Sequence, residues 1–384
     1  MTTTDPSLPE ELRHSPIRVI FGPGKLAALG DAARQHGANH VLLVTDPGIV
    51  AAGHVARAAS SLEAAGLRVT VFDGVAENPT CNHVYAGVAA AKEAGIDFIV
   101  GMGGGSAMDC AKCINLVLTN GEPVERFCGE GKATEPMLPL IAVPTTAGTG
   151  SEAQSFALIT DPVTHQKMAC GDRRLPTEGG LRPRVAILDP DLTASQPPRV
   201  AAASTIDALA HAIETAGSTV RNDTSLALSR AAWSRLDDAC ESALAPSAGR
   251  AVRASMLMGA HLAGAAIERS MLGAAHSCAN PLTSMFGVTH GIAVGVMLPW
   301  VIRFNAEAGE NPYEALGQGA ETLARRVESL LDSACVARRL SDHGIAPDAI
   351  PDLADMAANQ WTAKFNPRSV GPAELARIYE MAMG

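Results

Sequence analysis

DFIVGMGGGSAMDCAK, residues 97–112, contains a short apolar run, three consecutive glycines and the opening of a helical pattern. A strand, a tight turn and a helix in this order are typical of one half of a βαβ unit. Similar apolar runs alternate with Ala-rich helical stretches on both sides of it, at residues 41–45, 68–72, 138–143 and 185–188. We therefore expect a Rossmann-like α/β fold over residues 17–188, with a parallel sheet covered by helices on both faces.

The second half of the chain has a different pattern. From about residue 201 to the end, long Ala- and Leu-rich segments follow the helical period, and no strand is indicated. Residues 195–198, SQPP, interrupt both patterns. Because 384 residues exceed the size of one ordinary core, we predict a Rossmann-like α/β domain over residues 1–195 and an all-helical domain over residues 196–384.

Composition excludes several classes of protein. The chain is 47% hydrophobic and 18% charged with a net charge of −10, and it has no basic cluster suited to nucleic acid. Its longest apolar stretch, residues 291–302, is too short for a membrane span and contains Pro299. Residues 1–15 lack the apolar segment of a secretory signal, and the eight cysteines are scattered, so we expect a cytoplasmic protein with free thiols.

Two loops at predicted strand ends are candidates for binding a nucleotide. Glycines at 103–105 let a backbone approach a pyrophosphate, although such a run also fits a simple tight turn. Residues 144–152, PTTAGTGSE, follow the next strand and supply hydroxyls and amides where α/β sheets bind ligands. Asp46 ends the strand at 41–45, where its carboxylate fits either a ribose contact, which favours NAD over NADP, or a solvated turn.

Four polar side chains stand in apolar surroundings of the second half. Asp207 and His211 are four residues apart, so they share one face of a helix. His276 and His290 lie in residues 271–302, which contain no Asp, Glu, Lys or Arg. Each histidine alone fits a buried core position, but one carboxylate and three imidazoles together suit a divalent transition metal with a position left for substrate. The spacing of these four residues in the sequence is compatible with Fe²⁺, Zn²⁺, Ni²⁺ or Co²⁺ and does not distinguish among them.

These motifs resemble the iron-containing, group III alcohol dehydrogenases over almost the whole chain. The resemblance covers FGPG at 21–24, the turn at 103–109, the loop at 144–152, the segment 207–214, His276, THG at 289–291 and NPR at 366–368. It implies an NAD-dependent oxidoreductase acting on CH–OH groups, with Fe²⁺ as the first candidate metal and Zn²⁺ as the second. It also implies a homodimer and a small alcohol or aldehyde as substrate.

The resemblance assigns roles to individual residues. It implies that Asp207, His211, His276 and His290 hold the metal, which binds the substrate oxygen while hydride passes to the nicotinamide. Asn280 stands where many members carry a second histidine, so we expect it to offer the substrate a hydrogen bond, while the proton is exchanged through water, a cofactor ribose hydroxyl or Lys167. The resemblance also implies a set of residues that contact the cofactor, namely Asp46, Asn78, Gly104, Gly105, Ser106, Asp109, Thr145, Thr146, Thr149 and Lys167.

Two other enzyme classes stay open at this point. A hydroxyacid–oxoacid transhydrogenase would keep its NAD tightly bound and would need no added cofactor. An enzyme of the dehydroquinate synthase type would use metal and NAD but would oxidise its substrate only transiently, so it would form no net NADH.

Overall fold

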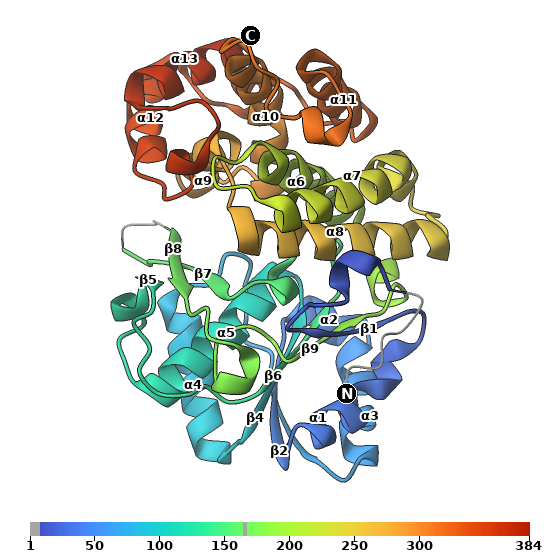
Figure 1. Ribbon diagram of the computed structural model, residues 1–384. Coiled ribbons are helices and arrows are strands. Elements are labelled where there is room, and N and C mark those ends of the chain that lie inside the picture. The colour runs from blue at the N-terminus through green and yellow to red at the C-terminus, as the bar shows by residue number, and fades with distance from the viewer. Residues whose placement is uncertain (1–7, 164–166) are drawn as a thin grey trace. The chain divides into compact units, whose positions relative to one another are not determined.

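The computed structural model describes residues 8–163 and 167–384, and the chain folds into two compact units (Figure 1). One unit comprises Met1–Thr146 and Gly150–Gln196, and the other comprises Ala147–Thr149 and Pro197–Gly384. We call them the α/β unit and the helical unit. The loop at 144–152 is therefore divided between the two units.

The α/β unit is built on a six-stranded sheet in which every neighbouring pair of strands is parallel. Four of its strands, β2, β4, β6 and β9, are buried at every residue, which explains their continuous apolar sequences. The predicted α/β fold is confirmed. In sheet order the strands are β1 (Arg18–Phe21), β9 (Val185–Leu188), β6 (Leu140–Pro144), β4 (Phe98–Gly103), β2 (His40–Val44) and β3 (Arg68–Phe72).

Helices cover both faces of this sheet (Figure 1). One apolar cluster includes residues of α1 (Leu29–Gln35) and α3 (His54–Ala64), and a second includes residues of α4 (Cys81–Ala94) and α5 (Gly105–Asn120). The short helix α2 (Pro47–Ala51) follows β2.

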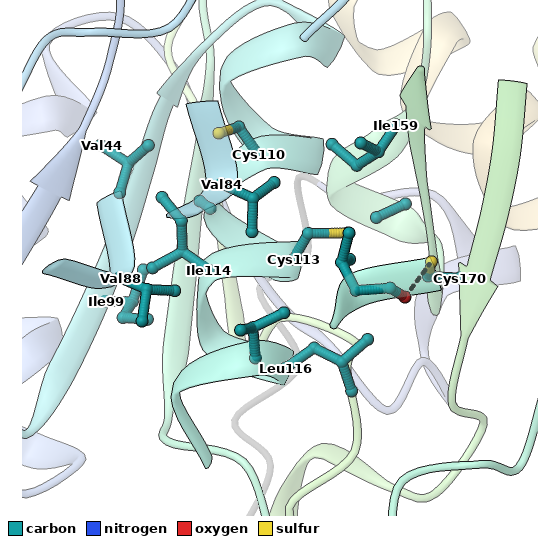
Figure 2. Packing of buried hydrophobic residues seen from close by; sticks show 14 of the residues in the cluster. Val44, Val84, Val88, Ile99, Cys110, Cys113, Ile114, Leu116, Ile159 and Cys170 are labelled. Carbon is teal, nitrogen blue, oxygen red and sulfur yellow. Dashed lines mark hydrogen bonds between the residues drawn. The ribbon is translucent and has the colours of Figure 1, made fainter. Parts of the chain in front are cut away.

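Figure 2 shows the second cluster, in which Ile114 of α5 lies near Val44 and Ile99 of the sheet. Cys110 and Cys113 also belong to this cluster, and all eight cysteines are free thiols. Burial raises the pKa of the Cys110 thiol to about 12, which keeps it protonated and unreactive. The Cys110–Cys113 pair therefore contributes to helix packing.

A second, smaller sheet in the α/β unit was not predicted from the sequence. It contains β5 (Gly129–Glu130), β8 (Lys167–Gly171) and β7 (Phe156–Thr160), and β7 and β8 are antiparallel. Its strands have two to five residues, and the apolar alternation in them is too brief to separate a strand from a loop.

The helical unit contains eight α-helices and no strand over residues 147–149 and 197–384. Its central helix, α6, is buried at every residue from Thr205 to Gly217 and packs against α7, α8 and α10. The helices are α6 (Pro198–Gly217), α7 (Asp223–Ala243), α8 (Arg250–Ser270), α9 (Ala274–Phe286), α10 (His290–Ala306), α11 (Ala320–Ser333), α12 (Ile350–Ala358) and α13 (Pro372–Met383). Among the described residues, no helix combines the length and apolarity that crossing a membrane requires.

Candidate functional site

Three of the predicted metal ligands come together in the helical unit. Asp207 lies in the middle of α6, His276 in the first turn of α9, and His290 is the first residue of α10. One ligand atom from each of these residues lies within 4.8 Å of the other two. Three helices that are far apart in the sequence thus present a carboxylate and two imidazoles to one point.

A glycine makes this convergence sterically feasible. A Cβ placed on Gly291 would lie 2.1 Å from the carbonyl oxygen of Ala203 and 3.1 Å from Cβ of Asp207. Any side chain at this position would push the start of α10 away from α6. Gly291 therefore lets the neighbouring His290 approach Asp207 closely.

His211 lies beside this group but is not one of the three residues whose ligand atoms meet within 4.8 Å. Its Nε2 atom is 3.6 Å from Oδ1 of Asp207, and its ring is stacked on that of His276 with 4.9 Å between the centroids. It is 4% exposed, as are Asp207 and His276. Its predicted role as a fourth ligand stays a prediction.

The buried polar atoms of this site lack protein partners. Asp207 Oδ1, His211 Nδ1 and His276 Nε2 make no hydrogen bond to any described residue. Polar atoms buried without a partner cost free energy, and native proteins rarely contain them without a bound ion or water. Imidazole nitrogens and a carboxylate oxygen are donors that Fe²⁺ and Zn²⁺ accept, so this set of residues fits a divalent transition metal.

The charges of the site favour an anionic Asp207. Burial opposes ionisation of this carboxyl, but the neighbouring His211, His276 and His290 outweigh it and lower its pKa. Burial lowers the pKa of His211 and so favours its neutral form. A carboxylate and a neutral imidazole are the forms that bind metal ions.

Glu214 orients His276, a role that the sequence analysis missed. Its carboxylate accepts a hydrogen bond from Nδ1 of His276 and another, of 2.9 Å, from the amide of Ala275. Burial lowers the pKa of His276, but the charge of Glu214 overcomes that effect and raises it to about 9. The contact turns Nε2 of His276 towards Asp207, at 3.4 Å from Oδ1. Such carboxylate–histidine pairs are common behind metal ligands, and the spacing of Glu214 from Asp207, two helical turns, was the available signal.

The NPR segment at 366–368 anchors the start of α9. Asn366 is 2% exposed, and its carbonyl oxygen accepts hydrogen bonds from the amide of Ala274 and from the side chain of Asn305. Its amide nitrogen donates to Asn305 and to the carbonyl of Arg368. These bonds fix the helix turn that carries His276.

Asn280 lies one turn after His276 in α9, so the two residues share a face of that helix. Asn280 is 6% exposed, and its Nδ2 donates a 3.0 Å hydrogen bond to Oε1 of Gln360. Gln360, two residues after the end of α12, was not identified from the sequence.

Several of the predicted cofactor residues lie together in the α/β unit. β2 and β4 are adjacent in the sheet, and a Cβ placed on Gly103 would lie 3.2 Å from Oδ2 of Asp46. A Cβ on Gly104 would meet the side chain of Thr146 at 3.4 Å. The hydroxyls of Thr145 and Thr146 are buried without a hydrogen-bond partner in the described chain. Hydroxyls without partners beside a glycine turn at strand ends fit a nucleotide-binding site.

Asp46 has a local role as well. Its side chain caps α2 by accepting a hydrogen bond from the amide of Ile49 at 3.1 Å. Gly104 is the N-cap of α5, and Gly105 and Ser106 form its first turn, where the backbone amides have no partner within the helix.

Asp109 is engaged inside the protein. Its Oδ1 accepts a 2.6 Å hydrogen bond from the hydroxyl of Ser151, and its Oδ2 accepts one of 3.1 Å from the amide of Leu158. The fully buried Lys112 lies 3.8 Å from the same carboxylate and donates to Ser151 and to the carbonyl of Phe156. This cluster ties α5 to the loop and strand that follow β6, and we call it the Lys112 cluster.

The remaining predicted cofactor residues lie in separate parts of the chain. Asn78 is exposed, with a left-handed backbone (φ 52°), and Lys167 begins β8 of the smaller sheet. Thr149 belongs to the three-residue segment of the helical unit, in which Gly148 packs against Ser204 of α6. Their contacts with a cofactor stay predictions.

Comparison with known proteins gives a consistent result over the whole chain. The family described as iron-containing alcohol dehydrogenase matches residues 16–190, and its C-terminal region matches residues 201–383. Alcohol dehydrogenase 4 of Schizosaccharomyces pombe is 32% identical over 392 residues, which cover 100% of this chain and 91% of that protein. Lactaldehyde reductase of Escherichia coli K12 is 31% identical, covering 94% of this chain and 97% of that enzyme.

Solved structures agree with this result. A 1,3-propanediol oxidoreductase has a TM-score of 0.89 and 31% identity, covering 95% of this chain and 97% of that one. Sulfoacetaldehyde reductase from Bifidobacterium kashiwanohense, solved with NAD⁺, has a TM-score of 0.86 and 27% identity, covering 96% and 98% of the two chains.

This chain is a two-domain protein, with an α/β unit followed by a helical unit. The helical unit contains a candidate metal centre made of a buried carboxylate and imidazoles. The chain belongs to the iron-containing alcohol dehydrogenase family, as the sequence motifs predicted. It is an oxidoreductase that acts on CH–OH groups.

Proposed function

We propose that this chain is an NAD-dependent, metal-dependent alcohol dehydrogenase that also reduces the corresponding aldehyde, with a small alcohol as its substrate. The observation that carries the proposal is the buried group of Asp207, His276 and His290, with a neighbouring imidazole from His211. We assign all four residues as ligands of one divalent ion, with Fe²⁺ preferred over Zn²⁺ because of the family.

Each protein group then has a defined task. A divalent ion held by these residues would supply Lewis acidity that favours loss of the hydroxyl proton from the alcohol. Asp207 contributes the negative charge of the site, and Glu214 holds the His276 ring so that Nε2 is available as a ligand. The apolar surroundings of the helices exclude water and strengthen these electrostatic interactions.

The α/β unit is assigned to the dinucleotide. Gly104, Gly105 and Ser106 offer backbone amides to the pyrophosphate, and the free hydroxyls of Thr145 and Thr146 offer hydrogen bonds beside them. Asp46 would accept from a ribose hydroxyl and repel the 2′-phosphate of NADP, which favours NAD. Support for NAD also comes from the related sulfoacetaldehyde reductase, whose structure contains NAD⁺.

Asn280 is not a proton donor or acceptor for the reaction, because an amide does not titrate in water. The alcohol proton therefore has to leave through water or another group. We assign Asn280 a hydrogen-bonding role instead.

The test is formation of NADH from a panel of small alcohols, measured by absorbance before chelation, after chelation and after addition of Fe²⁺ or Zn²⁺. We expect chelation to abolish turnover and metal to restore it. Asp207→Asn should lose the bound metal and more than about 100-fold in kcat/KM, because loss of even an outer-shell group costs up to about that factor.

The matched control for Asp207→Asn is His54→Gln, since His54 is a buried histidine that bonds Ser195 in the α/β unit. This variant should keep its metal. Full turnover by metal-free enzyme would refute the proposal. Turnover of hydroxyacid to oxoacid without added NAD, or metal-dependent consumption of substrate without net NADH, would favour the transhydrogenase or the dehydroquinate synthase type of enzyme.

A further inference from the structure

The face of α9 that carries His276 continues to Asn280, one helical turn further on. Side chains four residues apart on a helix have Cβ atoms about 5–6 Å apart and project in similar directions. Asn280 is therefore the next polar group on the His276 face of this helix. It lies within residues 271–302, where no Asp, Glu, Lys or Arg occurs.

Gln360 determines which end of the Asn280 amide is available. Oε1 of Gln360 accepts the hydrogen bond from Nδ2 of Asn280, while Nε2 of Gln360 donates to the carbonyl of Met356 at 3.4 Å. Gln360 thus presents an acceptor to α9, so the amide nitrogen of Asn280 is the atom that faces Gln360 and donates to it. The two segments are held together because α12 packs against α9.

The carbonyl oxygen of Asn280 is left without a donor. Nothing among residues 8–163 and 167–384 donates a hydrogen bond to it, although the side chain is 6% exposed. This oxygen is not among the fully buried polar atoms that lack a partner, so it keeps some contact with solvent, and a ligand that displaces water from it has to supply a donor in its place. A hydroxyl group is a suitable donor, whereas a carboxylate or sulfonate has no proton to give and would be repelled.

We infer that Asn280, held in orientation by Gln360, is a specificity-determining residue that accepts a hydrogen bond from a second hydroxyl on the substrate. The inference rests on the proposed function and deepens it, because it names the substrate class as small neutral alcohols with an additional hydroxyl near the reacting carbon. Such substrates are favoured over unsubstituted alkanols of the same length and over charged alcohols.

The experiment compares 1,2-propanediol with 1-propanol as substrates of the metal-loaded enzyme, with NAD and with NADH absorbance as the readout. The quantity measured is the ratio of the two kcat/KM values. The wild type should favour the diol. Asn280→Leu should lower the ratio about 10-fold, mainly through the KM of the diol, since it removes one hydrogen bond to the substrate and keeps the branched shape of the side chain.

Variants of Gln360 separate orientation from packing. Gln360→Leu removes the acceptor that orients Asn280, so it should also lower the ratio, whereas Gln360→Glu keeps an acceptor and should retain it within about 2-fold. The matched control is Asn359→Leu, because Asn359 is the preceding residue and its exposed amide bonds only the carbonyl of Asp355. This control should leave the ratio unchanged.

The possible outcomes are distinct. If the wild type oxidises both alcohols but the ratio is the same in Asn280→Leu, the inference is wrong and the proposed function stands. If the metal-loaded wild type forms NADH from neither alcohol nor from any other of the panel, the proposed function is wrong and the inference falls with it. Should Asn280→Leu fail to fold, a ratio unchanged in Gln360→Leu overturns the inference equally.

Discussion

The two units of this protein bury polar side chains in opposite ways. In the α/β unit, the Lys112 cluster is saturated, since the ammonium group donates to three oxygens and Asp109 accepts from Ser151 and Leu158. In the helical unit, Asp207, His211 and His276 each retain a buried atom with no partner in the described chain. Lys112 and the three residues of the helical unit are almost inaccessible to water and Asp109 is largely so, with a side chain that is 14% exposed, so the main difference lies in hydrogen bonding.

The Lys112 cluster has the properties of a structural scaffold, whereas the group around Asp207 has those of a binding site. A buried polar group whose partners are all internal stabilises one arrangement of the chain, while a group that keeps free donor or acceptor atoms is suited to a ligand. The hydroxyls of Thr145 and Thr146 follow the second pattern, although they are only a few residues from Ser151 of the saturated cluster. Substitutions in the two kinds of group should therefore have different consequences for stability and for metal binding.

The largest effect is expected from Lys112→Met, which should reduce the free energy of unfolding by about 3–5 kcal/mol, because it removes the cation nearest to the Asp109 carboxylate and leaves three oxygens that Lys112 bonds without their donor. Metal content should not change. Urea unfolding followed by circular dichroism measures the first quantity, and elemental analysis measures the second.

Lys92→Met is the matched control for this change. Lys92 has a side chain that is 61% exposed and is 4.0 Å from Glu122, so its loss should have almost no effect on stability. Equal unfolding curves for the wild type and Lys112→Met would contradict the assignment of the Lys112 cluster as scaffold.

An intermediate effect is expected from Glu214→Gln. This change weakens the hydrogen bond that orients His276, and it should lower metal affinity about 10- to 100-fold. Competition with a chelator of known affinity measures the change. Ser229→Ala, in the neighbouring helix α7, removes a buried hydroxyl that bonds Thr215 and the carbonyl of Ser225 but no proposed ligand, and it should leave metal affinity unaltered. Equal metal affinity in Glu214→Gln and the wild type would exclude an orienting role.

The smallest effect is expected at the surface of the helical unit. Hydrogen bonds from Arg303 and Arg325 lower the pKa of Glu321 to about 2 from its ordinary 4.5. A carboxyl whose pKa is depressed on folding stabilises the protein above the unfolded pKa and loses that contribution as the pH falls towards the folded one. The wild type should therefore exceed Glu321→Gln in stability at pH 6, and the difference should shrink as the pH falls from 4.5 to 2.

The difference in unfolding free energy between the wild type and Glu321→Gln should be below about 1 kcal/mol. The Glu321 side chain is 53% exposed, so solvent screens its ion pair with Arg303. Thermal unfolding across this pH range measures it. A difference that grows on acidification would contradict the sign of the shift.

Much of the fold was predictable because local patterns were strong. The strands at 68–72 and 185–188 occur at the predicted residues, since continuous apolar runs between helical stretches have few alternatives in an α/β protein. The small sheet of β5, β7 and β8 was missed because its strands depend on each other for their hydrogen bonds and have weak patterns of their own.

The site was predictable to the extent that its parts are local. Asp207 and His211 share a helix face by their spacing alone, and His276 and His290 stood out in a stretch without charges. No spacing rule joins Glu214 to His276, Asn366 to the start of α9 or Gln360 to Asn280, since each contact joins segments more than sixty residues apart; the spacing of Glu214 from Asp207 indicated only that these two share a helix face.

By itself, the amino-acid sequence determined the element types, the division into an α/β and a helical half, and the residue types available for metal and nucleotide. These properties follow from short-range periodicity and side-chain chemistry. Only the tertiary structure decided that Asp207, His276 and His290 meet at one point, with Gly291 allowing the approach and Glu214 fixing the ring. Helix packing decides such distances, because it depends on side-chain volumes from several remote segments at once.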